Sequence, residues 1–370
     1  MINFQKPLQS LKDAGRFRSL ILPMGIDLTS NDYLGMADHP QLKEFAIKSL
    51  ESGIDIGAAG SRLLRGHTNA HKSLEDFSAQ HFQSGKTLYF SSGFQANYAI
   101  FTTLPARKDI ILYDSLIHAS VRDGLSASKA KSFKFSHNDL NALEDLLKLH
   151  SDNAQTIWIA VESIYSMDGD YAPLSEIYDL CKKFDAYLII DEAHATGIFG
   201  DNGKGLAWNL IQKYGYDRMI TLHTCGKAIG VAGGLICASK DIIDYMINAA
   251  RPFIYSTAPM PLQALLVQKS LEILLSPDGE ERRKKLLLVC KEAKELLGGN
   301  GTHILPIILG EDKEALRIST ELQNQGFDIR AIRPPTVPEG SSRLRLSLSS
   351  SLNMKALRNF ASCFNSVKNN

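Results

Sequence analysis

The sequence lacks an excess of charge of either sign, and it lacks long apolar runs. Its 370 residues include 41 basic and 40 acidic side chains, which gives a formal net charge of +1. Balanced charge provides no electrostatic footprint for nucleic acid or for an anionic membrane surface. The apolar runs, such as Leu286 to Val289, are far too short to cross a bilayer. These absences argue against a nucleic-acid-binding or membrane-spanning protein.

Cysteine is also scarce, and its spacing does not suggest pairing. The five cysteines are an odd number, contain no C-x-x-C pair and lie far apart, at Cys181, Cys225, Cys237, Cys290 and Cys363. This pattern favours reduced thiols over disulfides or a zinc site. The first residues, Met1 to Lys6, lack the basic and apolar regions of a signal peptide. We therefore expect a cytoplasmic protein.

What the sequence does contain is a regular alternation of apolar and amphipathic segments. Six segments have the composition of buried strands, namely 87–90, 109–114, 156–161, 186–191, 218–222 and 234–238. Helical patterns lie between most of them, for example over 140–149 and 174–184. Near-continuous apolar strands separated by helices are typical of a mostly parallel sheet that is covered on both faces. The sequence thus predicts an α/β fold.

The pattern differs at both ends of the chain. Phe4 to Leu20 predicts an N-terminal helix, and 70–82 predicts a second helix. After about Pro259 we expect helices over 262–275, 280–297 and 313–325, with strands at 303–308 and around Ile329 and Leu344. We therefore expect three parts: an N-terminal helix and substrate-contacting arm (1–45), a large α/β domain (46–258) and a small α+β domain (259–370).

Lys227 lies between an apolar segment and a glycine-rich segment. Met219 to Leu222 precede it, and Gly230 to Gly234 follow it. A lysine in a desolvated site can lose its proton and condense with a carbonyl compound. The alternative is a lysine that lies near glycines by chance.

Other polar residues follow predicted strands, where an open parallel sheet binds its ligands. Asp191 closes a buried strand and needs a cationic partner, such as a pyridinium nitrogen. His194, three residues later, could donate to a phenolic oxygen. Ser92-Gly93-Phe94 opens a helix and would suit a phosphate, although a plain strand-to-helix turn fits equally well. His118 could stack on an aromatic ligand or be a structural histidine.

Two further readings of these residues are weak. Asp191-Glu192-Ala193-His194 could be a helicase-like magnesium box, but no G-x-x-x-x-G-K-[ST] loop accompanies it. His67, His71 and Glu75 have helical spacing that metal ligands can use, yet no H-E-x-x-H is present. We expect no metal. Arg345, in an alternating strand, is either an exposed charge or a carboxylate clamp.

Five motifs in this order resemble the α-oxoamine synthases, a family of fold-type I pyridoxal-phosphate enzymes. They are Ser30-Asn31-Asp32-Tyr33-Leu34-Gly35, Tyr165-Ser166-Met167-Asp168-Gly169-Asp170, Asp191-Glu192-Ala193-His194, Thr224-x-Gly226-Lys227 and Ile332-Arg333-Pro334-Pro335-Thr336-Val337-Pro338. The resemblance extends from Arg16 to about Arg358. It implies a large domain with a mostly parallel seven-stranded sheet covered by helices, a smaller α+β C-terminal domain, pyridoxal 5'-phosphate as cofactor, and a homodimer with a shared active site.

The resemblance also implies roles for single residues. Lys227 would hold the cofactor through a Schiff base, Asp191 would pair with the pyridinium nitrogen, and His118 would stack on the ring; these three are the expected catalytic residues. The remaining cofactor contacts would come from Gly93, Phe94, Ser166, His194 and Thr224, with Glu162 near the same pocket and with Ser256 and Thr257 reaching the phosphate from a second subunit. The expected substrate-binding residues are Arg16, Asn31, Arg333, Thr336 and Arg345, of which Arg345 would clamp the amino-acid carboxylate.

The activity that the resemblance implies is a decarboxylative condensation. L-Alanine would react with a pimeloyl thioester, carried by coenzyme A or by acyl carrier protein, with release of carbon dioxide and the thiol. The Arg333 to Pro338 loop favours this reaction over sister enzymes that use glycine or serine. A non-catalytic nucleotide- or protein-binding α/β protein is the alternative from another class. Two departures from the family pattern, Gly57-Ala58-Ala59-Gly60-Ser61 and Cys225, leave the acyl-chain preference open.

Overall fold

The computed structural model describes residues 4–369, which form two compact units. The larger unit contains residues 34–166 and 170–283. The smaller unit contains residues 4–33, 167–169 and 284–369. The division between the units thus falls near residue 33 and within helix α12 (Pro277–Leu297), whereas the predicted large domain ends at residue 258. The three-part division stays a prediction, and its residues 1–3 and 370 lie outside the described part of the chain.

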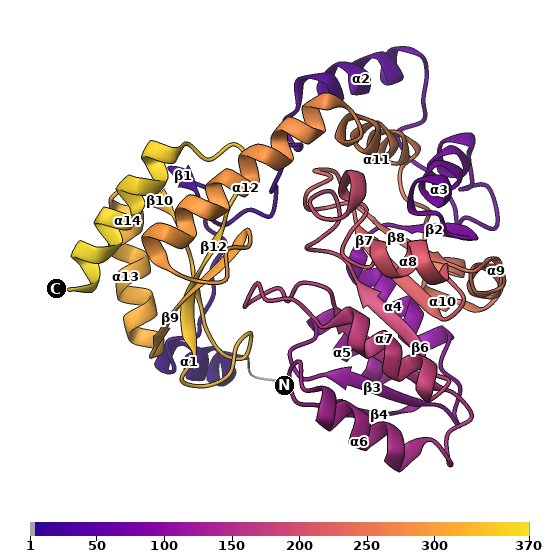
Figure 1. Ribbon diagram of the computed structural model, residues 1–370. Coiled ribbons are helices and arrows are strands. Elements are labelled where there is room, and N and C mark those ends of the chain that lie inside the picture. The colour runs from indigo at the N-terminus through magenta and orange to yellow at the C-terminus, as the bar shows by residue number, and fades with distance from the viewer. Residues whose placement is uncertain (1–3, 370) are drawn as a thin grey trace. The chain divides into compact units, whose positions relative to one another are not determined.

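A seven-stranded sheet forms the centre of the larger unit, as expected (Figure 1). Its strand order is β2-β8-β7-β6-β5-β3-β4. The strands are β2 (Lys86–Phe90), β3 (Ile110–Asp114), β4 (Lys131–Phe135), β5 (Ile157–Glu162), β6 (Tyr187–Asp191), β7 (Met219–Thr224) and β8 (Gly234–Ala238). Pairing is parallel from β7 through β4, and β8 runs antiparallel to both of its neighbours. The six predicted strands are present, and β4 at the sheet edge is the one that the apolar pattern did not reveal.

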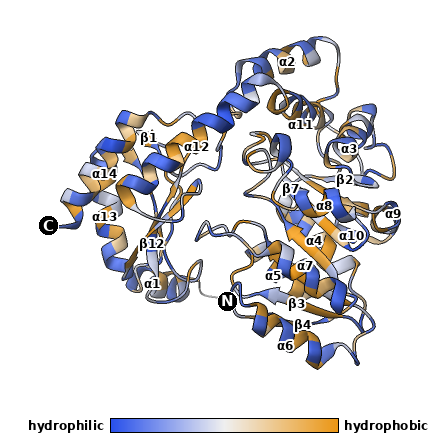
Figure 2. Ribbon diagram, viewed as in Figure 1, coloured by the Kyte–Doolittle hydropathy of each residue, from blue (hydrophilic) through white to orange (hydrophobic). Residues whose placement is uncertain are grey.

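Helices join the strands of the larger unit and supply apolar faces to the sheet. They are α2 (Pro40–Glu51), α3 (Asn69–Phe82), α4 (Gly93–Thr103), α5 (Ala119–Ala127), α6 (Leu140–His150), α7 (Leu174–Lys183), α8 (Trp208–Tyr214), α9 (Lys240–Ala249), α10 (Arg251–Ile254) and α11 (Pro261–Leu274), with a single 3-10 turn at Asp201–Gly203. In α4 the buried Ala96, Ala99 and Ile100 recur at helical spacing and pack in one cluster with Ile220 and Leu222 of the sheet. Figure 2 shows hydrophobic residues concentrated in this sheet, while the helices carry both hydrophobic and hydrophilic residues.

The smaller unit combines a short antiparallel sheet with helices. Its elements are α1 (Gln5–Asp13), β1 (Ile26–Asp27), β9 (Ile304–Gly310), α13 (Asp312–Asn324), β10 (Phe327–Asp328), β11 (Ala331–Ile332), β12 (Ser342–Ser347), α14 (Met354–Lys368) and the later part of α12. The sheet order is β11-β12-β9, and β1 pairs with β10 in a separate parallel pair. This is the expected α+β pattern.

The N-terminal helix is shorter than predicted. The pattern predicted a helix as far as Leu20, but α1 ends at Asp13. Gly15 adopts a φ of +64°, which is left-handed backbone that terminates a helix. Leu20 and Leu22, beyond this point, are exposed, so no buried face extends the helix.

No helix in the described chain is long and apolar enough to cross a membrane. All five cysteine thiols are free, and four of them are buried.

Candidate active site

Lys227 lies in a closed turn that follows β7. The N–H of Cys225 donates to the carbonyl of Gly233 over 2.9 Å, and the N–H of Val231 donates to the carbonyl of Cys225 over 2.9 Å. Cys225 is fully buried, so its side chain anchors the turn. The Nζ atom of Lys227 lies 2.6 Å from Nε2 of His194. The two residues that the sequence assigned to one cofactor are therefore in direct contact.

Asp191 closes β6 and is buried, with 5% of its surface exposed. Its Oδ2 accepts a hydrogen bond from Nδ2 of Asn97 over 2.7 Å, and its Oδ1 accepts one from the N–H of Ala193 over 2.9 Å. Both carboxylate oxygens thus have a donor, which lowers the cost of burying the charge.

Asn97 extends this contact toward His118. Its Nδ2 also donates to Oγ of Ser120 over 3.0 Å, and that hydroxyl lies 2.8 Å from Nδ1 of His118. A hydrogen-bonded chain therefore connects His118 to Asp191 across three elements, α5, α4 and β6. Asn97 and Ser120 were not predicted as site residues from the sequence. The one available signal was a polar residue on the otherwise apolar face of α4, which is weak evidence in a single sequence.

The ring of His118 is held neutral. Burial lowers the pKa of His118, and the charge of Asp191 offsets only part of that effect. Nδ1 accepts from the N–H of Ser120 over 3.2 Å, which fixes the imidazole at the start of α5. A neutral, fixed ring suits the predicted stacking role, because it adds no positive charge beside a cationic ligand ring.

Glu162 is a second buried carboxyl group beside Asp191, since these residues are partners in the register of β5 and β6. Burial, and then the charge of Asp191, raises the pKa of Glu162 well above its usual value. Two adjacent buried carboxylates disfavour each other's charge, which agrees with the raised pKa of Glu162. Oε2 of Glu162 accepts from the N–H of Ser166 over 3.1 Å, which places Ser166 at this group.

The start of α4 and the end of β7 form a close cradle. Ser92 caps α4 by accepting from the N–H of Gln95 over 3.1 Å, so Gly93 and Phe94 contribute the first amides of the helix. A Cβ atom on Gly93 would lie 3.0 Å from Oγ1 of Thr224. A Cβ atom on Gly234 would lie 2.9 Å from Cα of Gly93. A side chain at position 234 would force the backbone of Gly93 to shift, and the N-terminus of a helix favours an anion.

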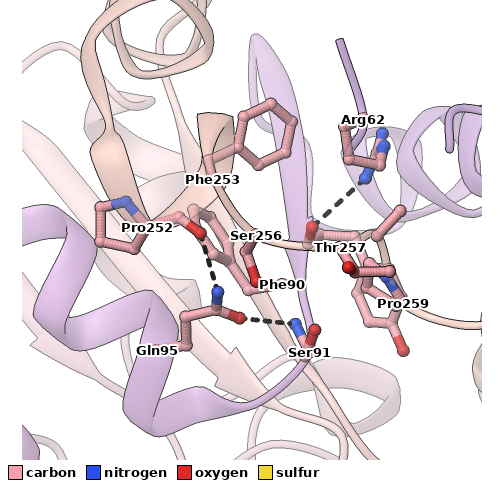
Figure 3. A pocket seen from close by; sticks show the side chains of 11 residues that line it. Arg62, Phe90, Ser91, Gln95, Pro252, Phe253, Ser256, Thr257 and Pro259 are labelled. Carbon is pink, nitrogen blue, oxygen red and sulfur yellow. Dashed lines mark hydrogen bonds between the residues drawn. The ribbon is translucent and has the colours of Figure 1, made fainter. Parts of the chain in front are cut away.

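Ser256 and Thr257 lie close to the same helix within the chain. Figure 3 shows both side chains in a small pocket with Ser91 and Gln95. Gln95 connects two segments that line this pocket. Its Nε2 donates to the carbonyl of Pro252 over 2.8 Å, and its Oε1 accepts from the N–H of Ser91 over 3.2 Å. Thr257 also forms an isolated β-bridge with Ser61 of the glycine-rich loop. The contribution of Ser256 and Thr257 to a second subunit's site stays a prediction.

The larger unit therefore has the groups that a phosphorylated pyridinium aldehyde requires. A buried, hydrogen-bonded carboxyl group could pair with the ring nitrogen, a glycine cradle at a helix start could hold the phosphate, and a lysine amine could meet the aldehyde. The close approach of Gly93 to Thr224 fits the phosphate of pyridoxal 5'-phosphate. The hydrogen-bond donors around Asp191 hold its carboxyl group as a partner for the ring nitrogen.

In the smaller unit, Arg345 is buried rather than an exposed strand charge. All six residues of β12 are buried. Nη1 of Arg345 donates to Oδ1 of Asn31 over 3.2 Å and to Oγ of Ser347 over 2.6 Å. Nη2 donates to the hydroxyl of Tyr33 over 3.4 Å. These contacts fix the guanidinium and group Asn31 with Arg345, as a carboxylate clamp would need.

The three residues predicted for the acyl substrate line one cavity of the smaller unit. Its volume is about 580 Å³, and its lining includes Arg16, Arg333 and Thr336 as well as Arg18 and Arg330. Arg18 donates to the hydroxyl of Thr336 over 3.1 Å, and Arg16 pairs with Asp312 and Glu339 at 3.2 Å and 2.8 Å. Exposed apolar side chains, such as Leu20 and Ile21, also line this cavity. Arginines beside apolar surface suit a chain that ends in an anionic group.

His67, His71 and Glu75 all have structural partners. His71 forms a capping box with Thr68 at the start of α3, and its Nε2 lies 2.8 Å from the carbonyl oxygen of Pro259. Glu75 pairs with Arg62 at 2.8 Å, and Arg62 also lies against Nδ1 of His67. Among residues 4–369 no group of three or more His, Cys, Asp and Glu side chains could hold a metal ion.

Comparison with known proteins agrees with this geometry. The family model described as aminotransferase class I and II matches residues 23–364. The 8-amino-7-oxononanoate synthase of Chromobacterium violaceum is 41% identical over 333 residues, which covers 88% of this chain and 84% of that protein. The protein of the same name from Geotalea daltonii is 38% identical over 370 residues, covering 94% of this chain and 93% of that protein.

Solved structures share the fold over nearly the whole chain. The 8-amino-7-oxononanoate synthase of Francisella tularensis is 27% identical with a TM-score of 0.79, covering 93% of this chain and 98% of that one. A serine palmitoyltransferase of S. paucimobilis is 24% identical with a TM-score of 0.88, covering 99% of this chain and 97% of that one, and it supports the fold alone. The chain belongs to the aminotransferase class I and II family, with the fold-type I architecture and the pyridoxal 5'-phosphate dependence of that group.

Proposed function

We propose that this protein condenses L-alanine with a pimeloyl thioester to give 8-amino-7-oxononanoate, carbon dioxide and the free thiol, a step of biotin biosynthesis. The observation that carries the proposal is the contact between Lys227 and His194, in a chain 36–41% identical to relatives named for that activity. The thiol carrier is coenzyme A or acyl carrier protein.

Each group of the larger unit has a task in this proposal. When bound, pyridoxal 5'-phosphate supplies an electron sink that stabilises negative charge at the amino-acid Cα. Asp191 pairs with the ring nitrogen, and Asn97 keeps its carboxylate oriented. Gly93, Phe94 and Thr224 hold the phosphate, with Ser256 and Thr257 contributed by a second copy of the chain.

Lys227 is the proposed base. Its Nζ removes the Cα proton of alanine and returns a proton after carbon dioxide has left. His194, at 2.6 Å from that nitrogen, orients the amine and donates to the phenolic oxygen. His118 covers the ring face, which excludes water from the reacting carbon. Ser166 completes the cofactor contacts beside Glu162.

The groups of the smaller unit bind the two substrates in this proposal. Arg345 and Asn31 take the carboxylate of alanine, because a fixed guanidinium matches a carboxylate in two parallel hydrogen bonds. Arg16, Arg333 and Thr336 take the acyl chain and its terminal carboxylate. Homodimer formation and a cytoplasmic location remain parts of the proposal.

The substrate assignment predicts a preference among amino acids. In a thiol-release assay with pimeloyl-CoA, we expect L-alanine to give a kcat/KM at least about tenfold above those of glycine and L-serine, which corresponds to about 1.4 kcal/mol of discrimination. The same assay with pimeloyl-acyl carrier protein identifies the carrier. A preference for glycine or serine would assign the chain to a sister oxoamine synthase.

The carboxylate clamp predicts a selective defect in Arg345→Lys. Lysine keeps the charge but cannot form two parallel bonds, so we expect the KM for L-alanine to rise about tenfold or more. The KM for the acyl thioester should not change. Arg358→Lys is the matched control, because Arg358 is 64% exposed and pairs with Glu292 at 2.6 Å on the surface. An unchanged KM for alanine in Arg345→Lys would remove Arg345 from this role.

A further inference from the structure

His137 lies between two carboxylates in the larger unit. Its Nδ1 is 2.9 Å from Oδ1 of Asp114, and its Nε2 is 2.7 Å from Oδ2 of Asp170. Both ring nitrogens can donate only when the imidazole is protonated. Burial lowers the pKa of His137, but the hydrogen bonds and charges of Asp114 and Asp170 outweigh burial and raise the pKa to about 10. His137 is therefore a cation at neutral pH.

Asp114, on one side of this cation, shapes the turn that leads to His118. It ends β3 and is fully buried. Its Oδ1 accepts from the N–H of Leu116 over 2.8 Å, and its carbonyl accepts from the N–H of Ile117 over 3.1 Å. The next residue is His118, which caps α5. The position of the His118 ring thus depends on the carboxylate of Asp114, to which His137 is hydrogen-bonded.

Asp170, on the other side, closes the turn that carries Ser166. Its carbonyl accepts from the N–H of Tyr165 over 3.0 Å, and Ile164 and Tyr171 form an antiparallel bridge beside it. The ring of Tyr165 meets the ring of His137 edge-on, with centroids 4.4 Å apart. Ser166 follows directly and donates to Glu162.

Asn138 reinforces the same junction. Its N–H donates to Oδ2 of Asp114 over 2.9 Å, and its Nδ2 donates to Oδ2 of Asp170 over 2.9 Å and to the carbonyl of Tyr171 over 3.0 Å. It achieves this with a φ of +53°, a conformation that asparagine tolerates better than most residues.

We infer that the cationic His137 is a positioning residue. It holds the turn that leads to His118 and the turn that carries Ser166 in place at the cofactor site. His137 comes from the loop after β4, the strand that no sequence pattern revealed, and it touches neither substrate nor cofactor in this account. The inference deepens the proposed function and rests on it for the roles of His118 and Ser166.

Hydrogen–deuterium exchange of the cofactor-free protein tests the fastening independently of any activity. In His137→Gln, we expect amides of 115–120 and of 163–166 to exchange about tenfold faster or more, because both turns lose an ionic anchor. The matched control is His39→Gln, which breaks a histidine–aspartate contact of 2.9 Å to Asp278 outside the site. Faster exchange confined to 136–139 would contradict the inference.

Cofactor titration tests the link to the site. We expect the Kd for pyridoxal 5'-phosphate to rise about tenfold or more in His137→Gln and to stay unchanged in His39→Gln. Unchanged affinity together with faster exchange in both turns would contradict the link to the cofactor site, while the condensation itself would still be tested by the thiol-release assay. If His137→Gln does not fold, Asp170→Asn removes one charge, keeps an acceptor oxygen and is measured in the same way.

The pH dependence distinguishes a charged anchor from a packing role. The groups that face His137 are Asp114, Asp170, Asn138 and Tyr165. Because the folded-state pKa lies above the ordinary value of 6.5, the stabilisation is complete below about pH 6.5 and is lost as the pH rises through about 10. The gap in melting temperature between wild type and His137→Gln should therefore narrow from pH 7 to 10.5. A constant gap would show a packing role instead.

Discussion

Lys227→Ala should abolish turnover, with a loss of about 10⁴-fold or more in the thiol-release rate. The variant loses both the amine that meets the cofactor aldehyde and the base that moves the Cα proton. Its neighbour His194, 2.6 Å from Nζ in the wild type, cannot replace it, because an imidazole does not form a Schiff base with an aldehyde as a primary amine does. The purified variant should also lack the visible absorption of a lysine-bound cofactor.

A surface lysine provides the control for this loss. Lys240, 72% exposed and paired with Asp244, lies at the start of α9. Lys240→Ala should therefore retain the wild-type rate. Turnover by Lys227→Ala at the rate of Lys240→Ala would overturn the assignment of the base.

Asp191→Asn should lower kcat by about 10²–10³-fold, because the neutral amide cannot stabilise a protonated ring nitrogen. The same change affects stability. Both oxygens of Asp191 accept hydrogen bonds, from Asn97 and from the N–H of Ala193. An amide offers one acceptor and sets its NH₂ against the other donor, so the free energy of unfolding should fall by about 1–3 kcal/mol.

Thermal melting and steady-state kinetics measured on the same preparations separate these two effects. Asp179→Asn is the control, since Asp179 is 65% exposed and pairs with Lys182 at 2.7 Å. It should change neither quantity appreciably. An Asp191→Asn enzyme that is less stable but fully active would show that the carboxylate serves the fold alone.

The central sheet could be predicted because burial on both faces leaves a strong pattern. β5 and β6 are almost wholly buried, so each is an apolar run that ends at an acidic residue, Glu162 or Asp191. Edge strand β4 carries exposed Lys131 and Lys134, and its composition resembles that of a loop. α1 was overestimated because the apolar residues after Gly15 continue the helical pattern, yet they contact solvent.

The candidate site could be predicted only where a motif is local in sequence. Lys227, Asp191 and His194 stand out by their position after buried strands. Asn97 and Ser120 do not, because they join Asp191 to His118 only after α4 and α5 have packed against the sheet. The alternation around Arg345 likewise could not separate an exposed from a buried arginine, since burial of β12 comes from its tertiary surroundings.

Borohydride reduction of the holoenzyme, followed by peptide mass spectrometry, tests the central claim most directly. Hydride reduces a C=N linkage between the cofactor and a lysine to a stable amine, so the modified residue can be read from the peptide. We expect a phosphopyridoxyl group on Lys227 in the peptide after β7, and its complete absence in Lys227→Ala. Modification of a different lysine, or of none in a protein that retains thiol-release activity, would contradict it.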